Sequence, residues 1–60
     1  MMEYYTLAII DNGIKKYYAE SGWITDKENA VWFTEYENAV EIAFDEGLEE
    51  DEMIIEKGWY

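Results

Sequence analysis

Two stretches near the start of the chain are rich in strand-forming residues. Residues 4–10 (YYTLAII) and residues 14–20 (IKKYYAE) are dominated by β-branched, aromatic and other apolar side chains. Between them lies Asp11-Asn12-Gly13, a sequence typical of a tight β-hairpin turn. Because side chains alternate along a strand, Tyr5, Leu7 and Ile9 share one face, and we expect that face to be the core face.

The register of this hairpin is open from the sequence. A two-residue turn at Asn12-Gly13 pairs Asp11 with Ile14, whereas a three-residue turn with Gly13 as a bulge pairs Ile10 with Ile14. The register decides whether Tyr18 or Tyr17 joins the core face.

The middle of the chain predicts two short elements. Ser21-Gly22 interrupts the second strand, and residues 25–28 (TDKE) form a capping signature for a short helical turn. The brief apolar run at residues 30–33 (AVWF) then predicts a short third strand.

The next segment predicts an amphipathic helix. Thr34 is the expected N-cap, Glu37 would close a capping box, and Gly47 fits the position that ends the helix. At helical spacing one apolar stripe forms, with Ile42 on its flank, and it consists of Tyr36, Ala39, Val40, Ala43 and Phe44. The opposite face consists of Glu37, Glu41 and Asp45.

Residues 53–57 (MIIEK) predict the last strand, so the element order is ββ(β)αβ. The sequence therefore predicts a single α+β domain over residues 1–60. In it, a small, largely antiparallel sheet of three to four strands carries one amphipathic helix on a face.

The composition argues against catalysis. Ser21 is the only serine, and the chain has no histidine or cysteine to activate a nucleophile. A tyrosine or lysine nucleophile stays open in principle, but no constellation of residues indicates one. No phosphate-binding loop occurs, and the carboxylates lack the spacing of a calcium loop. We expect no enzymatic activity, no cofactor and no metal. The start of the chain lacks the pattern of a signal peptide, and no apolar run is long enough for a membrane span, so we expect a cytoplasmic protein.

Charge is the feature that bears most on function. Fifteen acidic residues face four lysines, giving a net charge of −11, beyond the roughly 2–8 that solubility requires of a small domain. Excess charge of one sign destabilises a compact chain, which favours a role for it in binding a basic partner. Direct binding of nucleic acid is disfavoured because the chain has no arginine and would repel phosphates.

A domain roughly 27 Å across spans a length of duplex DNA that carries about 16 charges. The chain approaches this density only if several acidic segments converge on one side, with Glu3, Glu20 and Glu28 as further contributors. Exposed aromatic side chains would supply anchors for the contact. The residues expected to bind the partner are Glu37, Glu41, Asp45, Glu46, Glu49, Glu50, Asp51, Glu52, Tyr17, Trp23 and Trp32.

In size, acidity, lack of cysteine and α+β build, the chain resembles the small acidic inhibitors that bacteriophages and mobile elements encode: anti-CRISPR proteins, anti-restriction proteins and uracil-DNA glycosylase inhibitors. The aromatic second strand (residues 13–18), followed by Ala30, Phe33 and Ala39 at their spacing, is also similar to short phage proteins. The resemblance implies a viral protein that evades host defence by occupying the basic nucleic-acid channel of a host enzyme as a DNA mimic.

A second hypothesis uses the eleven aromatic residues, which are more than a sixty-residue core can hide. In it the chain is a protein–protein interaction module or inhibitor that binds through an aromatic surface or a sheet edge, a homodimer being one form. The acidity then serves only solubility.

Overall fold

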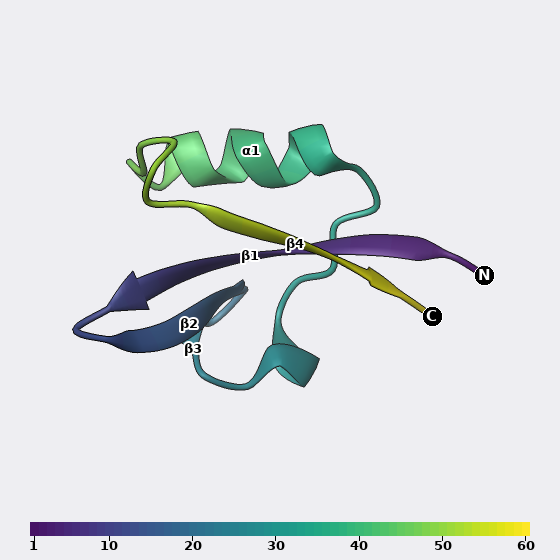
Figure 1. The fold of residues 1–60 in the computed structure, drawn as a ribbon, viewed down its shortest axis with the longest axis horizontal. Helices are drawn as coiled ribbons and strands as arrows, with labels where there is room; N and C mark the ends of the chain where they lie inside the picture. The colour runs from purple at the N-terminus through teal and green to yellow at the C-terminus, as the bar shows by residue number, and fades with distance from the viewer.

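The structure, a computed structural model, describes all 60 residues as a four-stranded sheet with one α-helix on a face (Figure 1). The elements along the chain are β1 (Glu3–Asp11), β2 (Ile14–Ala19), β3 (Gly22–Ile24), the 3-10 helix η1 (Lys27–Asn29), α1 (Tyr36–Asp45) and β4 (Ile54–Trp59). All pairs are antiparallel, and the strand order is β3-β2-β1-β4. The predicted α+β class and the single helix on a face are confirmed.

The hairpin between β1 and β2 has the two-residue turn. Asp11 pairs with Ile14 and Ile9 pairs with Lys16. Asn12 and Gly13 both have positive φ angles, 52° and 80°, which is the type I′ conformation that Asn-Gly favours. This register places Tyr18, and not Tyr17, on the same face as Leu7 and Ile9.

The third strand is not where the sequence predicts it. A second tight turn lets Ala19 pair with Gly22, so β3 is formed by Gly22–Ile24. Residues 30–33 make only one bridge, in which the backbones of Phe33 and Tyr5 exchange two hydrogen bonds of 2.8 Å. The reason is that β1 extends beyond its pairing with β2, so Tyr5 has a free backbone N–H and C=O that Phe33 satisfies.

The last strand runs further than predicted, from Ile54 to Trp59, because it pairs along β1 as far as Glu3. Beyond it the backbones of Met2 and Tyr60 exchange hydrogen bonds of 2.8 and 2.9 Å. β1 is therefore a central strand with partners on both sides, and β4 is an edge strand.

α1 begins later than predicted and ends as predicted. Its N-cap is Glu35, which makes no side-chain capping bond, so the expected box of Thr34 and Glu37 does not form. At the other end Gly47 has φ +82°, and its N–H donates to the Phe44 carbonyl at 3.0 Å. The N–H of Leu48 donates to the Ala43 carbonyl at 3.0 Å, which completes a Schellman motif.

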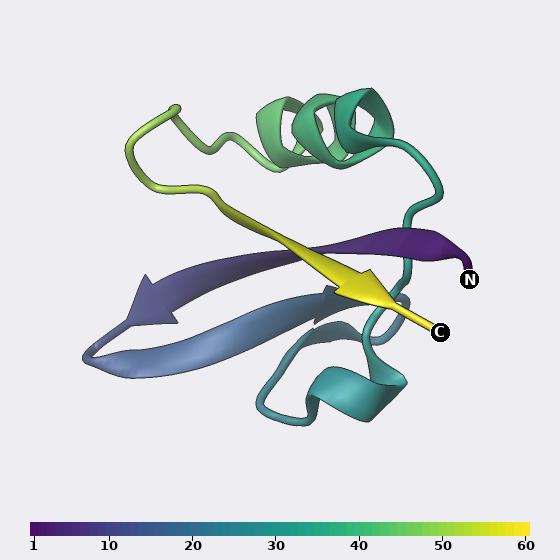
Figure 2. The same cartoon turned by 45° about the vertical axis from the view of Figure 1, so that its right-hand side comes forward.

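The short helical turn is confirmed as η1, although its N-cap is Asp26, whose side chain accepts a hydrogen bond from the Glu28 N–H. η1 lies on the opposite side of the sheet from α1 (Figure 2). The chain between β3 and α1 thus passes over the second face of the sheet. No helix of the structure has the length and apolar character needed to cross a membrane.

The fully buried core is small. It consists of Thr6, Leu7, Ala8, Ala19, Ala39 and Ala43. α1 rests on the sheet through its two alanines, and on β1 the core includes Thr6 and Ala8 of the second face as well as the expected Leu7. Within the predicted helix stripe, Tyr36 and Phe44 are 52% and 50% exposed, so the larger side chains flank the contact with the sheet instead of filling it.

Candidate functional site

The negative charge is concentrated in α1 and the turn that follows it. Residues 35–52, which we call the acidic layer, hold nine carboxylates and no lysine, and every one of these acidic residues is exposed. They are Glu35, Glu37, Glu41, Asp45, Glu46, Glu49, Glu50, Asp51 and Glu52. The rest of the chain holds six carboxylates and all four lysines, a net charge of −2 against −9 for the acidic layer. In Figure 1 the helix and the turn lie together on one side of the sheet.

Three of the four lysines pair with carboxylates of the sheet, and Lys27 of η1 forms no ion pair. Three ion pairs form, Lys15–Glu56 at 2.9 Å, Lys16–Asp11 at 2.8 Å and Lys57–Glu3 at 3.3 Å. Each joins residues of β1, β2 or β4, and none reaches the acidic layer. Glu3, which the sequence offered as a contributor to the acidic surface, is therefore neutralised, and Glu20 and Glu28 lie outside the acidic layer.

The Lys15–Glu56 pair spans the second face of the sheet. The hydrogen bond that Lys15 donates to Glu56, more than the charge of that carboxylate, raises the pKa of Lys15 above its ordinary value of 10.5, and the hydroxyl of Tyr17 adds to the effect. Both side chains are 36% exposed, so solvent screens the pair and limits its contribution to stability. Lys15 pairs with Ile10 of β1, so the register of the sheet places its side chain on the second face, away from α1.

Two carboxylates of the acidic layer occupy positions that disfavour folding. Asp45 and Glu46 lie at the C-terminus of α1, where the helix dipole repels negative charge and where the last turn has no basic residue. In the turn, Glu52 Oε1 accepts a hydrogen bond of 2.9 Å from the Glu49 N–H, but no cation approaches. No group of three or more acidic side chains converges as a metal site would require.

The acidic layer does not reach the charge density of duplex DNA against which the sequence was compared: its density is about half that of the duplex and near that of one strand. Spread over the full 34 Å length of the molecule, nine carboxylates give one charge per about 3.8 Å. A single strand of the duplex has one phosphate per about 3.4 Å. The eight carboxylates expected to bind a partner are all in this layer, and the structure adds Glu35.

The expected aromatic anchors lie elsewhere. Trp23 packs edge-on against Tyr18 on the sheet, with ring centroids 5.6 Å apart. Tyr17 lies below Lys15 on the second face, and Trp32 stacks on Tyr4 at 4.0 Å. The structure therefore does not bring these three aromatic residues together with the acidic layer, and their role in binding stays a prediction.

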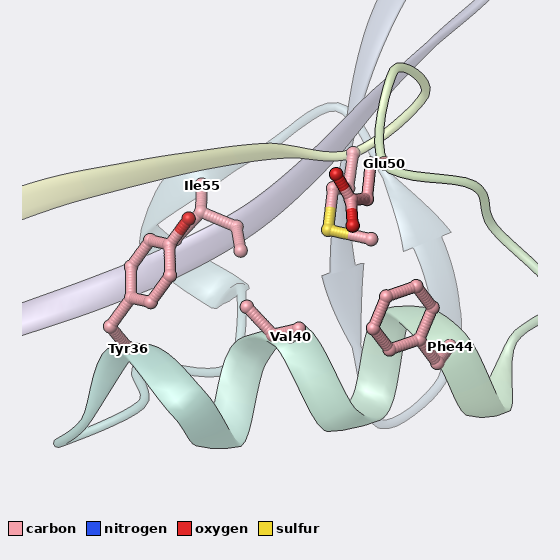
Figure 3. Close-up of a pocket in the computed structure, with 6 residues that line it drawn as sticks. Tyr36, Val40, Phe44, Glu50 and Ile55 are labelled. Atoms are coloured by element: carbon pink, nitrogen blue, oxygen red, sulfur yellow. The ribbon is translucent and has the colours of Figure 1, made fainter.

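Two aromatic residues that the sequence assigned to the core belong to the acidic layer instead. Tyr36 and Phe44 flank a hollow of about 380 Å³ between α1 and β4, which is also lined by Val40, Glu50, Met53 and Ile55 (Figure 3). The sequence signal for this exposed position of Tyr36 and Phe44, which the prediction did not use, is the pair of alanines at positions 39 and 43. Small residues let a helix approach a sheet closely, which leaves the larger neighbours at its sides.

No protein-family model matches this chain, and no similar protein was found among curated sequences or among solved structures. A functional assignment therefore depends on the surface chemistry: a single acidic layer without counter-charges, with half-exposed aromatic side chains beside it.

Proposed function

We propose that the protein is a phage-type inhibitor that binds the basic nucleic-acid channel of a host defence or DNA-processing enzyme, for example a CRISPR effector, in place of nucleic acid. In this proposal it acts in the host cytoplasm as a binding protein and not as an enzyme. The observation that carries the proposal is the segregation of charge, −9 in the acidic layer and −2 elsewhere.

Segregated charge suits such a role for two physical reasons. A surface of one sign steers an oppositely charged partner and accelerates association. Carboxylates spaced like the phosphates of one DNA strand also compete for the same Lys and Arg side chains that would bind the backbone. The unfavourable Asp45 and Glu46 at the end of α1 support selection for binding, since folding alone would favour neutral or basic residues there.

The proposal is tested by capture from host lysate on the immobilised protein at about 50 mM and about 500 mM salt, followed by identification of the retained proteins. We expect a nucleic-acid enzyme that is retained at low salt and released at high salt. Its binding to its own nucleic acid should be blocked by the protein.

A matched pair of variants separates the acidic layer from charge in general. Glu37→Lys with Glu41→Lys reverses two charges in the acidic layer, and Glu20→Lys with Glu28→Lys reverses two exposed charges outside it. The first pair should weaken the enzyme's binding at least tenfold, and the second should change it only a few-fold. Equal effects of the two pairs would contradict a role for the acidic layer.

A second candidate uses the aromatic cluster on the other face of the sheet. Tyr4, Trp32 and Tyr60 pack together there, with Trp32 and Tyr60 centroids 5.5 Å apart, and the last two are 43% and 59% exposed. Exposed aromatic rings are frequent anchors of protein interfaces. A partner or a second copy that stays bound at high salt, and that is lost on Trp32→Ser, would favour this function over mimicry.

A further inference from the structure

The hollow between α1 and β4 is apolar on its walls and acidic at its rim. Tyr36, Val40 and Phe44 are spaced four residues apart, so they form one row about 12 Å long on the side of α1. Met53 and Ile55 form the opposite wall (Figure 3). We call this hollow the α1–β4 groove.

The groove is open because one helix cannot cover the whole sheet. Four strands span about 15 Å across the sheet, whereas a helix with its side chains is roughly 10–12 Å wide. α1 contacts the sheet through Ala39 and Ala43. The side chains of Tyr36 and Phe44, which face the groove, are left half-exposed. Over β2 and β3 the aromatic rings of Tyr18, Trp23 and Phe33 pack against one another and cover the sheet. No equivalent side chains cover the β4 side, which is the edge of the sheet.

The charges around the groove select its occupant. Glu50 lines it, whereas Glu37 and Glu41 lie about 100° around α1 from Tyr36 and Val40, outside the lining. Lys57 of β4 is the one cation on the neighbouring strand, and it is already paired with Glu3 and lies over the Trp59 ring at 4.9 Å. An occupant with positive charge at its flanks would gain from this rim, and one with negative charge would be repelled.

These observations exclude a second copy of the chain as the favoured occupant. A dimer that joins two grooves would bring together two acidic layers with nine carboxylates each and no free cation between them. The repulsion in such an arrangement would oppose the gain from apolar burial.

We infer that the α1–β4 groove binds an amphipathic basic helix of the partner protein, with apolar side chains against Tyr36, Val40 and Phe44 and with Lys or Arg side chains toward Glu50. Such a helix would lie beside α1 over β4, the usual way in which an amphipathic helix enters an apolar groove. This inference rests on the proposed function and adds that the partner is held by apolar anchors as well as by charge.

Three synthetic peptides of equal length test the inference by NMR on the wild-type protein. One is a Lys/Leu amphipathic helix, one has the same lysines with serine in place of leucine, and one has the same leucines with glutamate in place of lysine. We expect the first to shift the methyl signals of Val40, Met53 and Ile55, and to bind at least tenfold more tightly than the other two.

Two variants locate the contact. Phe44→Ser should weaken binding of the Lys/Leu peptide at least tenfold, and Phe44→Leu should have a smaller effect. Ile14→Ser removes an apolar residue of similar exposure, 53%, in the distant hairpin and should change binding less than twofold. Since the peptide shifts are measured on the wild-type protein, the test does not depend on the folding of any variant.

The outcomes separate this inference from the proposed function. Equal binding of the Lys/Leu and Lys/Ser peptides, or shifts outside the groove, would overturn the groove inference and leave the charge-based function intact. Absence of binding by both basic peptides would also overturn it. A concentration-dependent shift of Met53 without peptide would assign the groove to a second copy. Capture of the enzyme by the charge-reversal variants is a separate measurement, and its loss tests only the proposed function.

Discussion

Replacing Gly58 by alanine should destabilise the protein, although glycine within a strand ordinarily makes a protein less stable than alanine does. Gly58 pairs with Tyr4 across β4 and β1, and the Tyr4 ring lies directly over it. A methyl group at Gly58 would overlap Cζ of Tyr4, so the ring must swing away. The ring would then leave Trp32, on which it stacks at 4.0 Å and 13°, and Tyr60, 5.8 Å away.

The magnitude follows from these two aromatic contacts. Each is worth about 0.5–1.5 kcal/mol, so losing both costs about 1–3 kcal/mol. Alanine recovers about 0.4–1 kcal/mol because it restricts the unfolded chain. The net loss lies between about 0 and about 2.6 kcal/mol, with a central value of about 1.3 kcal/mol. Each kcal/mol lowers the Tm of a domain of this size by about 4–8 °C.

The assay is a double-mutant cycle followed by urea unfolding. In the wild-type background Gly58→Ala should lower the free energy of unfolding, and near-UV circular dichroism should report the lost stack. In the background of Tyr4→Thr, which removes the ring and keeps a β-branched residue, Gly58→Ala should be neutral or stabilising. The reasoning is refuted if Gly58→Ala costs the same free energy in both backgrounds.

Three further predictions concern stability. Thr6→Val should raise the free energy of unfolding by about 1 kcal/mol in urea titrations, because the fully buried Thr6 Oγ1 has no hydrogen-bond partner. Thr6→Ser keeps the hydroxyl and should lower the free energy of unfolding. Asp45→Asn combined with Glu46→Gln should stabilise the protein by about 0.5–2 kcal/mol at low salt, because both carboxylates oppose the dipole of α1. The gain should be much smaller at 1 M salt, and an equal effect at both salt concentrations would contradict this reason. The stability that Lys15 contributes through Glu56 should be fully present below pH 10.5 and lost as the pH rises through the raised pKa of the folded state. The difference in stability between wild type and Lys15→Met, below about 1 kcal/mol at pH 8, should therefore vanish in strong alkali.

The features that the sequence predicted well depend on local chemistry. Asn12-Gly13 forms the predicted turn, since both residues accept positive φ angles, whereas the register of β1 and β2 was open between two turn lengths until the structure showed the two-residue turn. Gly47 likewise ends α1 through hydrogen bonds within the last turn of the helix. The clustering of carboxylates after residue 34 is also a property of adjacent residues and was visible without a structure.

The features that were predicted wrongly depend on contacts between distant segments. Phe33 pairs with Tyr5, which commits the chain just before the helix to an extended path, and the N-cap moves from Thr34 to Glu35. At the Ser21-Gly22 break the chain turns into β3, where Ala19 pairs with Gly22 and Trp23 packs on Tyr18. In the candidate site, three lysines pair with carboxylates of the sheet, and one of these pairs joins residues as distant in sequence as Lys57 and Glu3. The exposure of Tyr36 and Phe44 depends on where α1 lies over β1.

The central claim is that the acidic layer takes the place of nucleic acid on a basic partner. It is tested most directly by a competition titration, in which the captured enzyme carries a fluorescent oligonucleotide and the protein is added at low salt. The account predicts that the oligonucleotide is displaced at about one protein per site, and that displacement fails with Glu37→Lys and Glu41→Lys but persists with Glu20→Lys and Glu28→Lys. A ternary complex, in which the enzyme holds both the oligonucleotide and the protein, would contradict it.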